Sequence, residues 1–101
     1  MDPKSLRVFL SVADALNFSR VSEISHMSVS AVSRTIARLE DEVGVSLLQR
    51  DRRSMRLTPA GLEFVTYARD ALNRWNEMRR VLGSPEHLRG ELSLFCRLPP
   101  V

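Results

Sequence analysis

The hydrophobic positions at the start of the chain recur at helical spacing. Asp2 is a suitable N-cap, and Pro3 follows it at the first helical position, where the missing N–H costs no hydrogen bond. The apolar face of this predicted helix contains Leu6, Phe9, Leu10, Ala13 and Leu16. Asn17 and Phe18 interrupt the pattern. The spacing therefore predicts a first helix that ends before residue 17.

Two more helices are predicted, with a short connection between them. Ser19 is the expected cap of the second helix, in which Val21 and Ile24 are expected to face the core. Residues 26–27 form the predicted connection, and Ser28 is the expected cap of the third helix. The apolar stripe of that helix and the glycine that ends it are Val32, Ile36, Leu39, Val43 and Gly44. Two short helices joined by such a turn predict a helix-turn-helix.

The other side of the third helix is mostly small, hydroxylic or basic. It carries Val29, Ser30, Ser33, Arg34, Ala37 and Arg38, and the acids at positions 40–42 gather at its C-terminal end. Hydroxyl and guanidinium groups suit base edges and phosphates, and the helix dipole adds partial positive charge at the N-terminal end. Serines after a cap are common at any helix start. The whole pattern nevertheless predicts a helix that enters a major groove by its N-terminal end.

Residues 47–50 and 55–58 are two short runs expected to form the strands of a hairpin, or "wing". The window 50–56 contains four arginines and one aspartate and so carries the whole formal net charge of +3. Clustered arginines are typical of phosphate contact, and a solvated charged face is the alternative interpretation. Because no Asn-Gly or Asp-Gly turn is present, an exposed loop is the alternative to the hairpin.

A long amphipathic helix is predicted over residues 59–82. Thr58 is a suitable cap before Pro59, and Gly83 ends the pattern. Such a helix is ~36 Å long at 1.5 Å per residue and would project beyond a core of three short helices. Its apolar stripe is therefore the predicted dimer interface, and the alternative is that the helix covers only its own domain. The stripe consists of Leu62, Val65, Ala68, Leu72, Trp75, Met78 and Leu82.

These elements divide the chain into three parts and predict a mainly α fold. Residues 1–58 are the expected winged helix-turn-helix, with three helices and a short β-hairpin. Residues 59–83 are the long linker (dimerisation) helix. Residues 84–101 are a hinge and a strand that resembles the first strand of another domain.

Length and composition add few constraints. The 101 residues suit one domain with a modest core. No apolar run approaches the roughly 18 residues of a membrane span, and the N-terminus lacks a secretory signal. The single Cys96 cannot form an internal disulfide, which fits a reducing compartment. We therefore expect a cytoplasmic protein with no membrane partner.

Catalytic and metal chemistry find no support in the sequence. It has no Gly-x-Ser-x-Gly elbow, phosphate loop or paired-carboxylate signature. One cysteine and two distant histidines give no zinc-ligand spacing, and His26 belongs to the predicted turn. We expect no catalytic residue, cofactor or metal. A protein-docking module without DNA binding is the remaining alternative, and only DNA binding should weaken steeply with salt.

The motifs together are similar to the N-terminal region of LysR-type transcriptional regulators. The similar positions are Leu6, Phe9, Val12, Phe18-Ser19, Ser28, Ser30, Val32-Ser33-Arg34, Ile36, Leu39-Glu40, Gly44, Leu47, Arg50 and Leu57-Thr58-x-Ala60-Gly61. The resemblance implies operator DNA as the partner, with pairing through the linker helix and commonly a tetramer. It also implies a C-terminal domain that senses a small-molecule effector. That domain is missing, so we expect a fragment or a truncated product.

The resemblance implies a role for individual residues as well. The third helix would occupy the major groove and the arginine wing the adjacent minor groove. The predicted DNA-contacting residues are Ser28, Val29, Ser30, Ser33, Arg34, Arg38, Arg50, Arg52 and Arg53. Three positions depart from the family pattern: Val29 replaces a Gln or Pro, Val21-Ser22 replaces Ala-Ala, and Leu48 replaces Phe.

Overall fold

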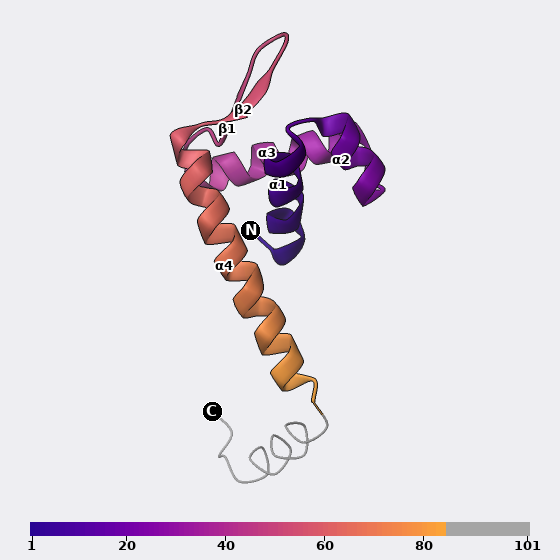
Figure 1. The fold of residues 1–101 in the computed structure, drawn as a ribbon, viewed down its shortest axis with the longest axis vertical. Coiled ribbons are helices and arrows are strands. Elements are labelled where there is room, and N and C mark those ends of the chain that lie inside the picture. Colours follow the sequence, from indigo (N-terminus) through magenta and orange to yellow (C-terminus); the bar gives the residue numbers. More distant parts are fainter. Residues whose placement is uncertain (85–101) are drawn as a thin grey trace.

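The computed structural model describes residues 1–84 and contains four helices and a two-stranded hairpin (Figure 1). The elements are α1 (Pro3–Ala15), α2 (Phe18–Ser25), α3 (Val29–Val43), β1 (Leu48–Arg50), β2 (Met55–Leu57) and α4 (Pro59–Leu82). The mainly helical winged helix-turn-helix predicted from the sequence is confirmed. The strand expected within residues 84–101, at positions 90–96, lies outside the described residues.

Each helix begins at a side chain that accepts a hydrogen bond from a backbone N–H three residues further on. Asp2 accepts from Ser5 at 2.8 Å, Ser28 from Ala31 at 3.0 Å, and Thr58 from Gly61 at 2.9 Å. These three predicted caps are confirmed. The fourth prediction, Ser19, is wrong because Asn17 caps α2 by accepting from the Arg20 N–H at 3.1 Å.

The core is one cluster of apolar side chains contributed by all four helices and the start of the wing. Its members are Leu6, Val8, Phe9, Val12, Val21, Val32, Ile36, Leu39, Leu47, Leu48, Phe64, Ala68 and Leu72. The rings of Phe9 and Phe64 meet edge to face, with centroids 5.1 Å apart, where α1 packs against α4.

Two apolar residues that were expected inside lie at the surface. Leu16 follows α1 as its left-handed C-cap, so its side chain leaves the buried face formed by Val8 and Val12. Ile24 is 61% exposed. The short α2 turns position 25 inward instead, and the Ser25 hydroxyl donates to the Val21 carbonyl at 2.6 Å. The prediction that these two side chains face the core is wrong.

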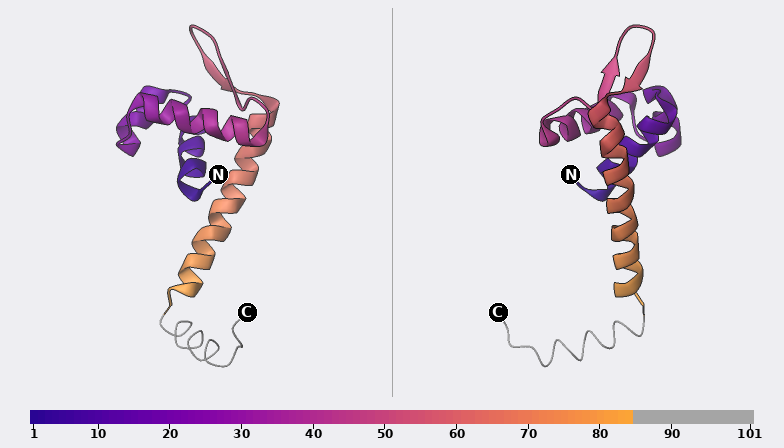
Figure 2. Two further views of the ribbon diagram at one scale, coloured as in Figure 1. Left: turned by 180° about the vertical axis from the view of Figure 1, so that it is seen from behind. Right: turned by 60° about the vertical axis from the view of Figure 1, so that its left-hand side comes forward.

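The last helix, α4, extends well past the rest of the domain. Its N-terminal part packs against α1, and its C-terminal part projects with no other helix or strand of residues 1–84 beside it in either view of Figure 2. The wing and α3 lie at the opposite end of the molecule from the C-terminus of α4 (Figures 1 and 2). The predicted length and projection of this helix are confirmed. No helix among residues 1–84 is long and apolar enough to cross a membrane.

Candidate nucleic-acid interface

The turn between α2 and α3 is held by hydrogen bonds from side chains. His26 ends α2 in the left-handed conformation, with φ at 58°. Across the turn, the hydroxyl of Ser22 donates to the carbonyl of Met27. Ser22 is one of the positions that depart from the family's Ala-Ala, and an alanine could not form this bond. The departure therefore adds a connection across the turn that sets where α3 begins.

The outer surface of α3 presents polar side chains that have no partner within residues 1–84. Ser30, Arg34 and Arg38 are exposed, and Ser33 is half-buried. Within residues 1–84, none of these four side chains forms a hydrogen bond or a salt bridge. The Ser28 hydroxyl differs because its oxygen already accepts the capping hydrogen bond. These unpaired donors and acceptors can bind an external polyanion and its base edges.

The hairpin predicted from the sequence is confirmed. Strands β1 and β2 are antiparallel, with Leu48 opposite Leu57 and Arg50 opposite Met55. An aspartate closes the tip, since one carboxylate oxygen of Asp51 accepts from the N–H groups of Arg53 and Ser54, both at 2.9 Å. These hydrogen bonds, that from Arg53 first, lower the pKa of the Asp51 carboxyl. Asp51 thus stabilises the turn through its side chain, although the turn has no Asn-Gly or Asp-Gly pair.

The arginines of the wing do not form one group. Arg52 and Arg53 are exposed at the tip, and in the described part of the chain their guanidinium groups make no salt bridge. Arg50 instead lies over the ring of Phe18, with its guanidinium carbon 4.8 Å from the ring centroid. This cation–π contact joins the end of β1, next to the tip of the wing, to the start of α2. Sequence reasoning missed it because 32 positions separate the two residues.

A single carboxylate attaches the wing to α3. Glu40 Oε2 accepts from the N–H of Leu47 at 2.7 Å and from the N–H of Leu48 at 3.2 Å. The sequence pattern showed only that Glu40 lies with other acids at the C-terminal end of this helix, away from the end predicted to enter the groove. Glu40 has the further effect of fixing the direction in which the wing leaves α3.

The same short segment attaches α4. The Thr58 hydroxyl donates to the Ser46 carbonyl at 2.7 Å, and the Thr58 N–H donates to the Leu47 carbonyl at 3.0 Å. A Cβ at Gly61 would lie 2.1 Å from the Leu47 carbonyl oxygen, so only glycine permits this approach. We call residues 40, 46–48, 58 and 61 the joint, because they connect α3, the wing and α4.

The predicted dimer stripe divides into buried and exposed residues. Ala68 and Leu72 are buried in the core of their own chain, and Val65 is half-buried against it. These three side chains are occupied within one chain and offer little surface to a second copy. The exposed members of the stripe are Leu62, Trp75, Met78 and Leu82, and Tyr67 and Val81 are further exposed apolar residues of α4.

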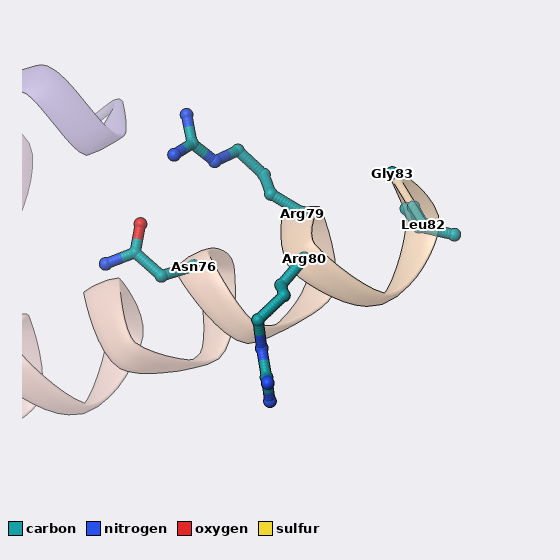
Figure 3. Close-up of a pocket in the computed structure, with 5 residues that line it drawn as sticks. All are labelled: Asn76, Arg79, Arg80, Leu82 and Gly83. Atoms are coloured by element: carbon teal, nitrogen blue, oxygen red, sulfur yellow. The ribbon is translucent and has the colours of Figure 1, made fainter. Parts of the chain in front are cut away.

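The C-terminal end of α4 has a shallow, open surface pocket but no converging polar groups. Figure 3 shows Arg79 and Arg80 pointing to different sides of the helix, with Leu82 pointing away from both. Arg80 is already paired with Glu77, at 2.6 Å between Nη2 and Oε2. Within the described residues, no three His, Cys, Asp or Glu side chains gather as they would around a metal ion.

Known proteins share both the sequence pattern and this geometry. Residues 3–62 match the bacterial regulatory helix-turn-helix protein, lysR family. The transcriptional activator IlvY of Haemophilus influenzae is 37% identical over 97 residues, which are 95% of this chain and 33% of that protein. A crystal structure of the BenM DBD with catB site 1 DNA has a TM-score of 0.75 and 31% identity, covering 80% of this chain and 87% of that one. Vibrio fischeri DarR in complex with DNA has a TM-score of 0.77 and 34% identity, covering 81% of this chain and 28% of that one.

The similarity is therefore to one part of longer proteins. The chain spans about a third of the length of the IlvY relatives that it matches, and those relatives are transcriptional regulators. The match includes all of the helix-turn-helix, the wing and the start of α4. This chain belongs to the lysR family of bacterial regulatory helix-turn-helix proteins.

Proposed function

We propose that this chain is the DNA-binding part of a cytoplasmic transcription regulator that recognises a double-stranded operator. In this proposal α3 occupies a major groove and the wing approaches the neighbouring minor groove. The observation that carries it is the set of unpaired hydroxyl and guanidinium groups on α3, at the same end of the molecule as the arginine tip (Figure 1). The two similar structures solved with DNA support the same assignment.

The two arginine groups would have different tasks. Arg34 lies on the exposed side of α3, where a guanidinium can bind the two acceptors of a guanine in the major groove. Arg52 and Arg53 project from a tip whose backbone Asp51 holds, and they suit phosphates or the minor-groove edge. Binding would thus combine a sequence-specific contribution from α3 with a general electrostatic one from the wing.

The partner for the uncovered part of α4 would be a second copy of the chain. Its exposed apolar side chains include Trp75, which is 43% exposed, with Met78 and Leu82 one and two turns further on. A symmetric dimer would place two α3 helices in major grooves about one turn of DNA apart, ~34–36 Å, or a multiple of it. For a protein of the length of the IlvY relatives we expect a tetramer and a C-terminal domain that binds a small effector.

Selection of bound sequences from random duplex DNA, followed by affinity measurements across a range of salt, tests this function. We expect a two-fold symmetric consensus and an affinity that falls steeply as salt rises. Arg34→Ala should lower affinity for the consensus more than for unrelated DNA, and Arg53→Ala should lower both and flatten the salt dependence. Arg7→Ala removes the same charge from an exposed position of α1, outside α3, the wing and the projecting part of α4, and is the matched control.

The result that contradicts the proposal is equally clear. If no DNA sequence is enriched at any salt concentration, the DNA-binding proposal fails and the protein-docking interpretation takes its place. Equal behaviour of Arg34→Ala, Arg53→Ala and the control on the selected consensus would remove these two arginines from the interface.

A further inference from the structure

The first position of α3 carries an exposed apolar side chain. Val29 is 45% exposed, whereas Val32, one turn further along the helix, is completely buried. The Ser28 cap fixes the backbone in front of Val29, so the position of this side chain is well defined. An isolated exposed valine needs no explanation by itself, because folded proteins expose many apolar atoms. Val29 is different because its neighbours on the helix surface are polar residues that we assign to DNA binding.

Val29 belongs to the surface that we assign to the major groove. Ser30 is the next residue, Ser33 lies one turn away, and Arg34 is five residues further on. Each of these three presents a polar group without a partner in the described part of the chain, and Val29 is the apolar residue beside them. A side chain without a donor or acceptor would leave the polar edge of a guanine, adenine or cytosine unsatisfied if it covered that edge.

Thymine is the ordinary base whose major-groove edge includes an apolar group, the 5-methyl. We propose that Val29 reads a thymine in each half-site by packing against this methyl group. The inference rests on the proposed function and adds the identity of one base. Residues 29 and 34 are separated by ~7.5 Å along a helix, about two base-pair steps, so this thymine should lie within about two steps of the base that Arg34 contacts.

The experiment replaces single thymines of the selected consensus with deoxyuridine, which lacks the methyl group and keeps every hydrogen-bonding atom. For the unaltered chain we expect one position per half-site at which the replacement weakens binding about fourfold, the effect of one buried methyl group. Replacing both symmetric thymines should weaken binding about fifteenfold. At that position Val29→Ala should discriminate between the thymine and deoxyuridine operators by less than about twofold, because the alanine loses the two γ-methyl groups and most of the contact with the base.

Val45→Ala is the matched control. Val45 is a valine of similar exposure, at 51%, in the loop after α3, and its substitution should leave the fourfold discrimination intact. Far-ultraviolet circular dichroism and thermal melting of both variants show whether the fold is kept, which we expect because both side chains are exposed.

Each other outcome overturns the inference in a distinct way. If no thymine is sensitive to the loss of its methyl group, Val29 does not read one. If Val29→Ala keeps the full fourfold discrimination at the sensitive position, another residue makes the contact. If the random-sequence selection yields no consensus, the proposed function fails first and the inference fails with it.

Discussion

The two halves of α4 have the same apolar periodicity and different surroundings. In the covered half, residues 59–72, Phe64, Ala68 and Leu72 are buried against the domain. In the projecting half, residues 73–82, Trp75, Met78 and Leu82 continue the apolar pattern into a region where the rest of the domain does not reach. Helical spacing thus locates an apolar face, but it does not reveal which molecule covers that face.

The largest expected effect of a substitution in α4 is on folding, in the covered half. Leu72→Ala should lower the free energy of unfolding by about 2–5 kcal/mol, because it leaves a cavity where α4 packs on the core. Urea unfolding followed by circular dichroism measures the change. Leu82→Ala removes the same atoms in the projecting half and should change the stability of the monomer by less than about 0.5 kcal/mol. If both variants lost the same free energy of unfolding, the projecting half would be packed as tightly as the covered half.

Gly61→Ala tests the first turn of the covered half. The added Cβ would meet the Leu47 carbonyl oxygen, so the joint must open, at a cost of about 1–3 kcal/mol. The same chemical unfolding experiment applies. Gly83→Ala is a milder control, since its Cβ would lie 3.0 Å from a carbonyl oxygen of the last helical turn. A Gly61→Ala variant as stable as the parent would show that the joint is easily deformed.

Trp75→Ala tests the projecting half. We expect the dimer dissociation constant to rise at least about thirtyfold, equivalent to about 2 kcal/mol, because large aromatic side chains dominate interface energetics. Sedimentation equilibrium over a range of concentrations measures this constant. Folding of the monomer should change little, since Trp75 lies outside the core cluster. An unchanged constant would remove Trp75 from the interface and leave the projecting half without its proposed partner.

The smallest effect is expected at the exposed ion pair between Glu77 and Arg80. Glu77 raises the pKa of the Arg80 guanidinium through a hydrogen bond, but both side chains are exposed to solvent. Glu77→Gln should therefore leave the thermal melting temperature almost unchanged, because solvent screens an exposed ion pair. A marked fall in that temperature would mean that this end of α4 is packed against something, most simply the second copy.

Local sequence patterns predicted the helix starts better than they predicted the packing. Ser28 and Thr58 cap their helices through bonds to residues three positions away, so nearby sequence contains the necessary information. Asn17 and Ser19 are both good caps, and the pattern around them did not decide between the two. Phe18 became the first residue of α2, where its ring also meets Arg50 of the wing.

The candidate interface was predicted in outline and not in its internal connections. The arginines and serines were found because their residue types suit DNA. The contacts of Arg50 with Phe18 and of Glu40 with the wing join residues that are distant or unremarkable in the sequence. Both contacts were missed because only the folded chain brings these residues together.

The joint holds α4 at a defined angle to α3 and the wing, so any bending at the joint swings the whole length of α4. With an arm of ~36 Å, a rotation of ~5° at the joint displaces the far end of α4 by ~3 Å, close to the rise of one base pair. In the proposed dimer the two copies pair through α4. The stiffness of the hydrogen bonds around Leu47 would therefore determine how much the spacing between the two half-sites can vary. A stiff joint would accept one spacing, and a compliant joint would accept spacings that differ by a base pair.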